Sequence, residues 1–147
     1  MFSDLLNAIK GILESNTLIQ AVQDYESLKT DDDPVAIIIP SGNESDYNTT
    51  EENVRIYAYK IMIFVKRTGI RNESSAERVL RNIVDSVIDD LDKDYMLVTA
   101  GAPVVTGYTF MGIFAVPSSW GYALEGDQYR VAQIDVTARV SVDLNNI

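Results

Sequence analysis

Apolar and polar residues alternate along residues 74–93 with the period of an amphipathic helix. The apolar positions follow at intervals of three and one: Ala76, Val79, Leu80, Ile83, Val84, Val87, Ile88 and Leu91. Because an α-helix completes a turn in 3.6 residues, this spacing forms one continuous stripe. Ser74 and Glu77 have the spacing of a capping box, which predicts the start of the helix. Such a helix must lie on an apolar layer, and the other segments predict a β-sheet.

Two further stretches have the composition or the alternation of β-strands. Val35–Ile39 is a β-branched run that a Pro-Ser-Gly sequence closes. Tyr129–Leu144 alternates most cleanly, and its apolar side is expected to meet the 74–93 helix. That side comprises Ala132, Ile134, Val136, Ala138, Val140 and Val142.

A third predicted strand is interrupted. Tyr108–Val116 and Trp120–Leu124 read as one long strand, broken by a Pro-Ser-Ser sequence. Because proline cannot donate to a sheet ladder, Pro117 predicts an edge strand or a bulge. Residues 125–128 predict the tight turn into the last strand.

The stretch Val54–Arg67 is apolar on both of its faces, so both are expected to be covered. A strand with one solvated face alternates apolar with polar residues, whereas the middle of this stretch does not. The 74–93 helix is expected to cover one face. Either the N-terminal helix or a neighbouring subunit is expected to cover the other.

The N-terminal region predicts a short helix and one further element. Ser3 is the expected N-cap, and the helix is expected to end near Asn16. Residues 19–25 fit a helix or an edge strand, and we favour the strand. A short strand is also expected at Leu97–Thr99. In order, these elements predict an α+β fold in a single domain over residues 1–147: an antiparallel-rich mixed sheet of about four to five strands with the two helices packed on it.

Composition excludes several kinds of chemistry. The chain has no cysteine and no histidine, which rules out disulfides, Cys/His zinc sites and Cys- or His-based catalysis. We therefore expect no catalytic residues, no metal and no cofactor. Apolar runs are too short to cross a bilayer, and the first residues lack the basic start of a signal peptide. Cytosolic synthesis and no membrane partner are expected.

The chain is acidic, and its charge is uneven. Because the net charge is −10, the protein is expected to repel nucleic acid over most of its surface. Residues 54–81 nevertheless hold seven basic residues against two acidic ones, a net +5 that leaves −15 for the rest. Blocks of opposite sign suit head-to-tail self-association. A solvated helix face with charged strand ends explains the pattern equally well.

Three polar or weakly patterned segments lie between the predicted elements. Asp31–Asp33 brings three carboxylates together, but no second ligand cluster accompanies them, so a solvated acidic turn is favoured over a metal site. The loop expected at Gly42–Asn53 is long and acidic, which is typical of a functional or partner-ordered segment. That loop and Ala100–Gly107 are expected to decide what the subunit joins.

Candidate contacts to other subunits or partners are charged and aromatic. For Trp120, core filling at the strand bend is favoured over anchoring a partner. For Tyr57 and Tyr59, core or interface packing is favoured over base stacking, because the protein is acidic. The outward face of the 74–93 helix is basic early and acidic late, a candidate seam between copies. The full candidate set is Arg55, Tyr57, Tyr59, Lys66, Arg67, Arg71, Arg78, Arg81, Glu44, Asp46, Glu51, Glu52 and Trp120.

The order, length and pattern of these elements resemble the tail terminator, or tail completion, proteins of long-tailed bacteriophages. The likeness lies in the N-terminal helix, the strand Pro34–Pro40 with the polar loop after it, the strand Arg55–Phe64, the helix Ser74–Leu91 and the hairpin Gly107–Val142. The resemblance implies a virion structural protein that forms a homo-oligomeric ring, usually of six subunits, at the head-proximal end of the tail tube. Such a ring ends tube polymerisation and joins the tail to the neck.

The partners that the resemblance implies are further copies of the chain, the tail tube protein and a neck, stopper or connector protein. DNA would pass through the lumen without specific binding, and neither an enzymatic activity nor a cofactor is implied.

Two other classes of function are open to the same sequence. One is a related virion joint, such as a head-completion or stopper protein; its loss yields capsids that leak DNA, whereas loss of a terminator yields overlong tails. The other is a small enzyme with an Asp/Glu pair. It is disfavoured because carboxylates at turns and on helix faces are mostly solvated.

Overall fold

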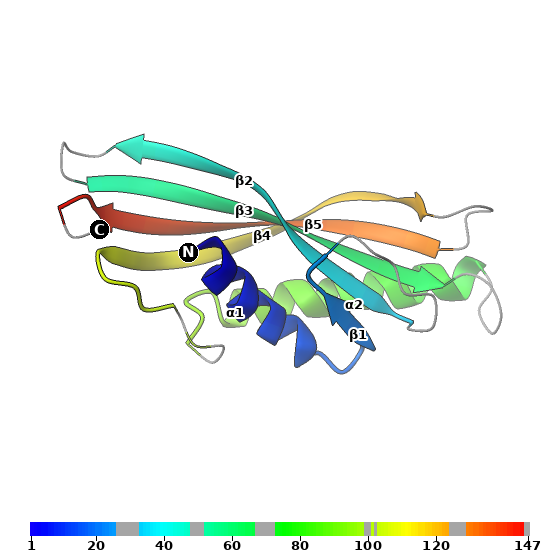
Figure 1. Ribbon diagram of the computed structural model, residues 1–147. Helices are drawn as coiled ribbons and strands as arrows, with labels where there is room; N and C mark the ends of the chain where they lie inside the picture. The colour runs from blue at the N-terminus through cyan, green and yellow to red at the C-terminus, as the bar shows by residue number, and fades with distance from the viewer. Residues whose placement is uncertain are drawn as a thin grey trace.

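The described part of the chain forms two helices and one five-stranded sheet, which confirms the predicted α+β fold (Figure 1). The computed structural model describes residues 1–25, 33–47, 52–66, 73–98, 101, 103–123 and 129–145. In chain order the elements are α1 (Phe2–Glu14), β1 (Ala21–Gln23), β2 (Val35–Tyr47), β3 (Glu52–Lys66), α2 (Glu73–Lys93), β4 (Tyr108–Ala123) and β5 (Tyr129–Asp143).

The sheet is mostly antiparallel, in the order β1-β2-β3-β5-β4. Only β1 runs parallel to its neighbour, β2. The segment 19–25 therefore contains the favoured edge strand. At the opposite edge, β4 is one continuous strand whose register shifts between Phe110 and Gly112 and again between Pro117 and Ser119. The proline thus marks both an edge and a bulge, as predicted.

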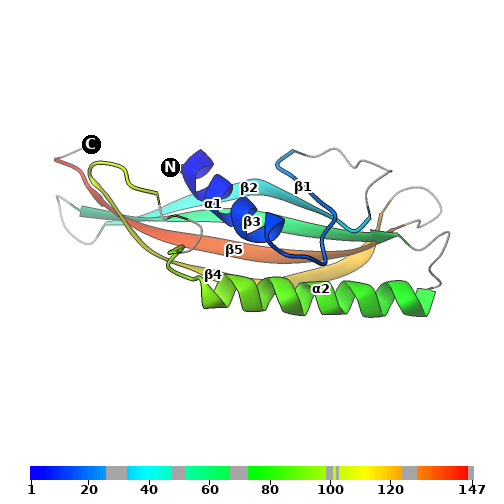
Figure 2. The ribbon, with the colours of Figure 1, turned by 90° about the horizontal axis from the view of Figure 1, so that it is seen from below.

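Both helices pack on the same face of the twisted sheet. The main core joins α1 and α2 to the odd-numbered residues of β3, such as Tyr59, and to the even-numbered residues of β5, such as Ile134. Figure 2 shows α1 in front of the strands and α2 running alongside β4 and β5. The expected contact between the apolar side of β5 and the long helix is confirmed. The alternative that the N-terminal helix covers the second face of β3 is wrong.

Asn16 fixes the end of α1 against α2. Its side-chain amide nitrogen donates to Ser86 Oγ and Asp90 Oδ2, each at 2.9 Å, and its Oδ1 accepts from the Leu18 N–H at 2.9 Å. The residue is 5% exposed. This amide therefore sets where the chain turns after α1, close to the predicted end of that helix.

Both predicted helix starts are shifted. Helix α1 begins at Phe2, because the Met1 carbonyl accepts the first helical bond from the Leu5 N–H at 3.0 Å, and Ser3 is not the N-cap. Helix α2 begins at Glu73, so Ser74 lies inside it. The carboxylate of Glu77 contacts Arg130 instead of closing a capping box, and a charge-assisted bond is the stronger of the two.

Two expected features of the connections are also wrong. Asn43–Tyr47, predicted as part of a loop, continues β2 in register with β3, and residues 48–51 lie outside the described part. The register shifts between Pro40 and Gly42, so the strand passes the turn signal as a bulge. Leu97, which is buried with φ 55°, and Val98 belong to no strand, so the short strand predicted there is wrong for these two residues; Thr99 lies outside the described residues.

Candidate functional surfaces

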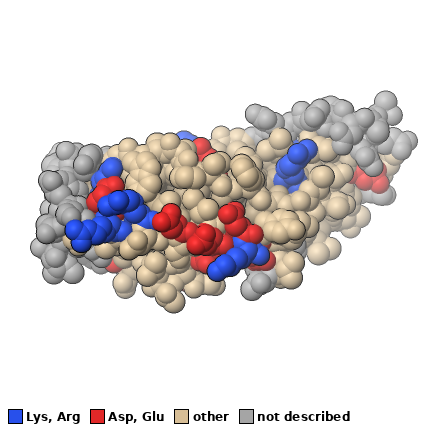
Figure 3. Space-filling model, turned by 180° about the vertical axis from the view of Figure 1, so that it is seen from behind, with Lys and Arg blue, Asp and Glu red and all other residues tan. Residues whose placement is uncertain are grey.

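The outward face of α2 carries a line of charged side chains, basic first and acidic afterwards. Arg78, Arg81, Asp85, Asp89 and Asp92 are all exposed. Figure 3 shows a group of basic side chains at one end of this side of the molecule with acidic ones beside it, and further basic side chains near the middle and toward the other end. A shallow hollow of about 430 Å³ lies over Arg78, Arg81, Asn82 and Asp85. We call the five exposed charged residues the α2 stripe.

The basic residues that cluster in the sequence do not form one patch. Arg55 and Lys66 lie near opposite ends of β3, and eleven residues of strand span about 36 Å. Arg55 Nη1 is 3.3 Å from the Tyr108 hydroxyl, and hydrogen bonding to Tyr57 and Tyr108 raises its pKa. The Lys66 N–H donates to Asp33 Oδ1 at 2.9 Å.

The remaining charged candidates are not described in the same detail. Arg67, Arg71 and Glu51 lie outside the described residues, and of Glu44, Asp46 and Glu52 only the backbone is described, in β2 and β3. Asp33 is the one described residue of the acidic turn at 31–33. Within the described part of the chain, no group of three Asp, Glu, His or Cys residues could hold a metal ion.

Tyr57 and Tyr59 belong to the core of the subunit. Both are buried, and the ring of Phe2 packs edge-on against each, with centroid distances of 4.7 and 5.7 Å. The Tyr59 hydroxyl donates to the Phe2 carbonyl at 2.8 Å. Burial, with smaller contributions from Tyr57 and Asp4, raises the Tyr59 pKa. These two tyrosines therefore pack inside the subunit and are not surface contacts.

Strand β4 exposes a row of large apolar side chains along the edge of the sheet. Phe114 is 65% exposed and Val116 is 45% exposed. The alternate residues Ile113 and Ala115 face the core. Met111 and Trp120 are exposed as well. Core filling by Trp120 is therefore wrong: at the register shift after Pro117, its ring remains 44% exposed.

The apolar surface continues from β4 across the outer face of the sheet. Trp120 lines a hollow of about 260 Å³ with Met62, Phe64 and Val131. A small second core lies on this face and comprises Val35, Ile37, Phe64 and Tyr129. Among the described elements, no helix covers this face. We call Met62, Phe64, Phe114, Val116 and Val131 the outer apolar surface. Trp120 only borders it, because it pairs with Ala132, which faces the main core.

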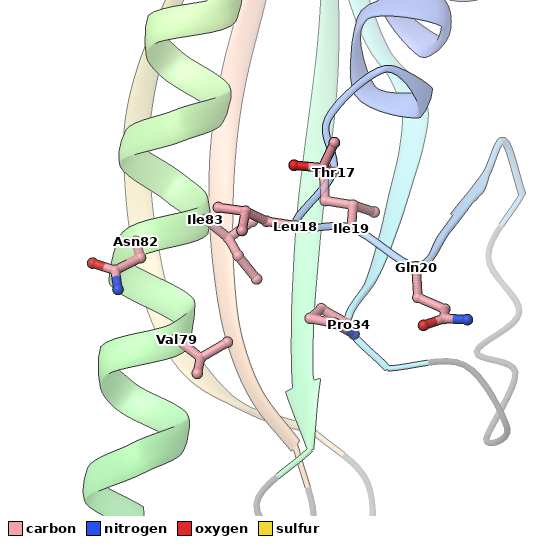
Figure 4. A pocket seen from close by; sticks show the side chains of 8 residues that line it. All are labelled: Thr17, Leu18, Ile19, Gln20, Pro34, Val79, Asn82 and Ile83. Carbon is pink, nitrogen blue, oxygen red and sulfur yellow. The ribbon is translucent and has the colours of Figure 1, made fainter.

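One pocket on the helix side of the sheet is uncharged. It has a volume of about 610 Å³ and lies between α2 and the connection from α1 to β1. Figure 4 shows Val79 and Ile83 reaching toward it from α2, with Leu18 and Ile19 opposite. The other lining residues are Thr17, Gln20, Pro34 and Asn82. None of these side chains is an acid, a base or a strong nucleophile, so the pocket offers shape and neutral polar atoms without acid–base chemistry.

The described features are thus surfaces suited to contact with other macromolecules. None of the described helices is both long enough and apolar enough to cross a membrane. No family model matches the chain, and no curated protein matches it either.

Proposed function

We propose that the protein is a tail terminator of a long-tailed bacteriophage, a virion subunit that forms a ring on the head-proximal end of the tail tube. The observation that carries this proposal is β4: a 16-residue edge strand with four large apolar side chains exposed. Long apolar edge strands pair with other chains unless they are protected. A subunit with such an edge is suited to association.

The other edge of the sheet offers a second surface of the same kind. Strand β1 pairs only with Val35–Ile37, so in the described part of the chain the rest of β2 has no neighbour on that side. In the described part of the chain, no strand pairs with the outer edge of β4, although the Ile113 N–H on that edge already bonds the Tyr95 carbonyl at 2.8 Å. Each copy thus offers a partly open edge at β4 and another at β2. Two different surfaces on one subunit make a head-to-tail joint, which closes into a ring when the rotation per subunit permits.

The outer face of β3, which no described helix covers, fits the same arrangement. The N-terminal helix and a neighbouring subunit are the two covers expected for this face, and α1 packs on the opposite face. A neighbouring subunit is therefore the cover that we propose for the outer face of β3. The net charge of −10 also suits a ring around DNA, because adhesion to the phosphate backbone requires cationic contacts.

The test is assembly with tail tubes. Purified protein is mixed with tubes of the tail tube protein from the same phage, and tube ends are examined by electron microscopy. We expect rings on one end only and an arrest of further tube growth. Light scattering of the protein alone reports whether the ring forms before it binds. A protein that stays monomeric and never decorates tube ends would refute the proposal.

A pair of variants ties the result to β4. Phe114→Asp with Val116→Asp places charges on the exposed edge and should abolish ring formation while the far-ultraviolet circular dichroism spectrum is retained. Val98→Asp is the matched control, because Val98 is 79% exposed and lies outside the sheet. Equal assembly by both variants would remove β4 from the joint.

A further inference from the structure

The α2 stripe occupies one narrow sector of its helix. Each residue advances an α-helix by about 100°, so Arg78, Arg81, Asp85, Asp89 and Asp92 fall within about 80° of one another. The opposite side of the helix is buried against the sheet, through residues that include Leu80, Ile83, Val87 and Leu91. The stripe therefore points straight away from the core, and all five side chains are exposed.

Oppositely charged residues of the stripe lie at equal distances on the two sides of Asp85. Residues 78 and 92 are equally distant from it, and they are Arg and Asp; residues 81 and 89 are equally distant, and they are again Arg and Asp. Glu77 and Lys93, outside the stripe, are also equally distant from Asp85 and opposite in charge, with the acidic residue first. Rotation of the helix by 180° about an axis through Asp85 thus exchanges each basic position with an acidic one.

We propose that the α2 stripe is a two-fold docking surface for a second copy of this chain. The two α2 helices pack antiparallel with Asp85 of both copies at the axis. Arg78 of each copy then faces Asp92 of the other, and Arg81 faces Asp89. The hollow over Arg78, Arg81, Asn82 and Asp85 receives the acidic half of the other helix.

Charge complementarity selects this occupant. A partner of uniform charge, such as nucleic acid, would match one half of the stripe and be repelled by the other. A second copy in parallel orientation would bring like charges together. Only the antiparallel copy satisfies both halves, and it does so with one surface that is complementary to itself, as a two-fold contact requires.

The stripe is not explained by the stability of its own helix. A helix dipole favours acidic residues in the first turns and basic residues in the last. Here Arg78 and Arg81 lie in the first half, whereas Asp89 and Asp92 lie near the C-terminal end. The order of charges opposes the dipole. The ion pair of Arg81 with Glu77 on the same helix, at 3.9 Å, is exposed and contributes little to stability.

This contact is independent of the proposed ring joint. A two-fold contact joins copies in pairs, whereas a ring needs two different surfaces on each subunit. In solution the contact doubles whatever unit is present: it makes a dimer from monomers, or a pair of rings from single rings. Loss of one contact leaves the other intact, so the two proposals fail separately.

The experiment uses charge exchange, followed by sedimentation velocity at low salt. In Arg78→Glu/Arg81→Glu the stripe is wholly acidic, and in Asp89→Lys/Asp92→Lys it is basic apart from Asp85. We expect the self-association constant of each variant to be at least tenfold lower than that of the natural chain. An equimolar mixture should form a mixed pair. In the chain with all four substitutions, the first half of the stripe is acidic and the second half is basic. Its two halves are again complementary, so this chain should pair with itself.

Controls separate this contact from general electrostatics. Glu14→Lys changes an exposed charge on α1 and should leave pairing unchanged. Salt should weaken pairing of the natural chain, because the screening length is about 10 Å at 0.1 M salt and about 3 Å at 1 M. Asp85→Asn should strengthen pairing, since it removes the one like-charged contact at the axis.

Three results would overturn the proposal. They are a natural chain that shows no doubling at low salt, a mixture of the two variants that stays unpaired, and a four-substitution chain that remains folded but does not associate. Association of the natural chain that persists unchanged in both charge variants would likewise place the contact elsewhere.

Discussion

The carboxylate of Glu77 on α2 accepts a hydrogen bond from the guanidinium of Arg130 on β5, with 2.6 Å between Oε2 and Nε. The same guanidinium donates through Nη1 to the Gly121 carbonyl on β4 at 2.7 Å. One side chain therefore joins α2 to two neighbouring strands. Arg130 is only 18% exposed, so its interactions are partly shielded from water.

Removal of this guanidinium should destabilise the fold. We expect Arg130→Met to lower the free energy of unfolding by about 2 kcal/mol, because hydrogen bonds to charged groups contribute more than neutral ones. Urea unfolding followed by circular dichroism measures the change. Arg81→Met is the control: Arg81 lies 3.9 Å from the same carboxylate but is 59% exposed, and its loss should cost less than about 0.5 kcal/mol. Equal effects of both substitutions would contradict the assignment.

The buried amide of Asn16 should contribute to stability in the same way. Asn16→Ala removes three hydrogen bonds at once and leaves the Leu18 N–H without its acceptor. We expect a loss of about 2 kcal/mol in the free energy of unfolding. Asn7→Ala, at an exposed position of α1, should change it by less than about 0.5 kcal/mol. A neutral Asn16→Ala would show that water replaces the amide without loss.

Tyr59 should make the protein sensitive to alkaline pH. Its pKa is raised in the native state, whereas in the unfolded chain a tyrosine titrates near pH 10. Above about pH 10 the unfolded chain therefore releases a proton that the native state keeps, and stability falls as pH rises.

Comparison with Tyr59→Phe isolates this effect. At neutral pH the variant should be less stable by about 1 kcal/mol, because it lacks the bond to the Phe2 carbonyl. Above about pH 10 the natural chain should lose stability faster, by at most about 1.4 kcal/mol for each pH unit. Urea titrations at several pH values between neutral and alkaline measure both slopes. Parallel slopes would mean that Tyr59 titrates normally.

Gly112 should resist substitution, whereas Gly121 on the same strand should not. Gly112 has φ 127°, a backbone conformation that residues with a side chain rarely adopt, at the first register shift of β4. The following residue, Ile113, donates its N–H to the Tyr95 carbonyl at 2.8 Å. We expect Gly112→Ala to cost about 1–2 kcal/mol. A Cβ on Gly121 meets no atom within 4 Å, so Gly121→Ala serves as the control.

Period and turn signals predicted most of the fold. The stripe of α2 and the alternation of β5 were clear because both elements bury one face, and the structure brings those faces together. The polar stretch after Pro40 was misread because composition alone suggests a loop there. Pairing of Asn43–Tyr47 with β3 overrides that local preference.

The candidate surfaces were harder to predict, because they depend on which side of a strand each residue occupies. Tyr57 and Tyr59 share a face that α1 covers. Pro117 predicts the bulge before Trp120, but not how exposed the Trp120 side chain is after the register shift. Arg55 and Lys66 are close in sequence, yet an extended strand separates them. Only the α2 charges stayed together, because a helix keeps residues at intervals of three and four on one side.

Because β1 pairs with only three residues of β2, most of the described edge of β2 is available to an added strand. From β2 to β4 the four strands are all antiparallel to their neighbours, so β2 and β4 themselves run in opposite directions. Copies placed side by side in the same orientation would bring β4 of one against the uncovered part of β2 of the next. Those two strands would be antiparallel, and the hydrogen-bonding pattern within each subunit would continue across every boundary without a change of type.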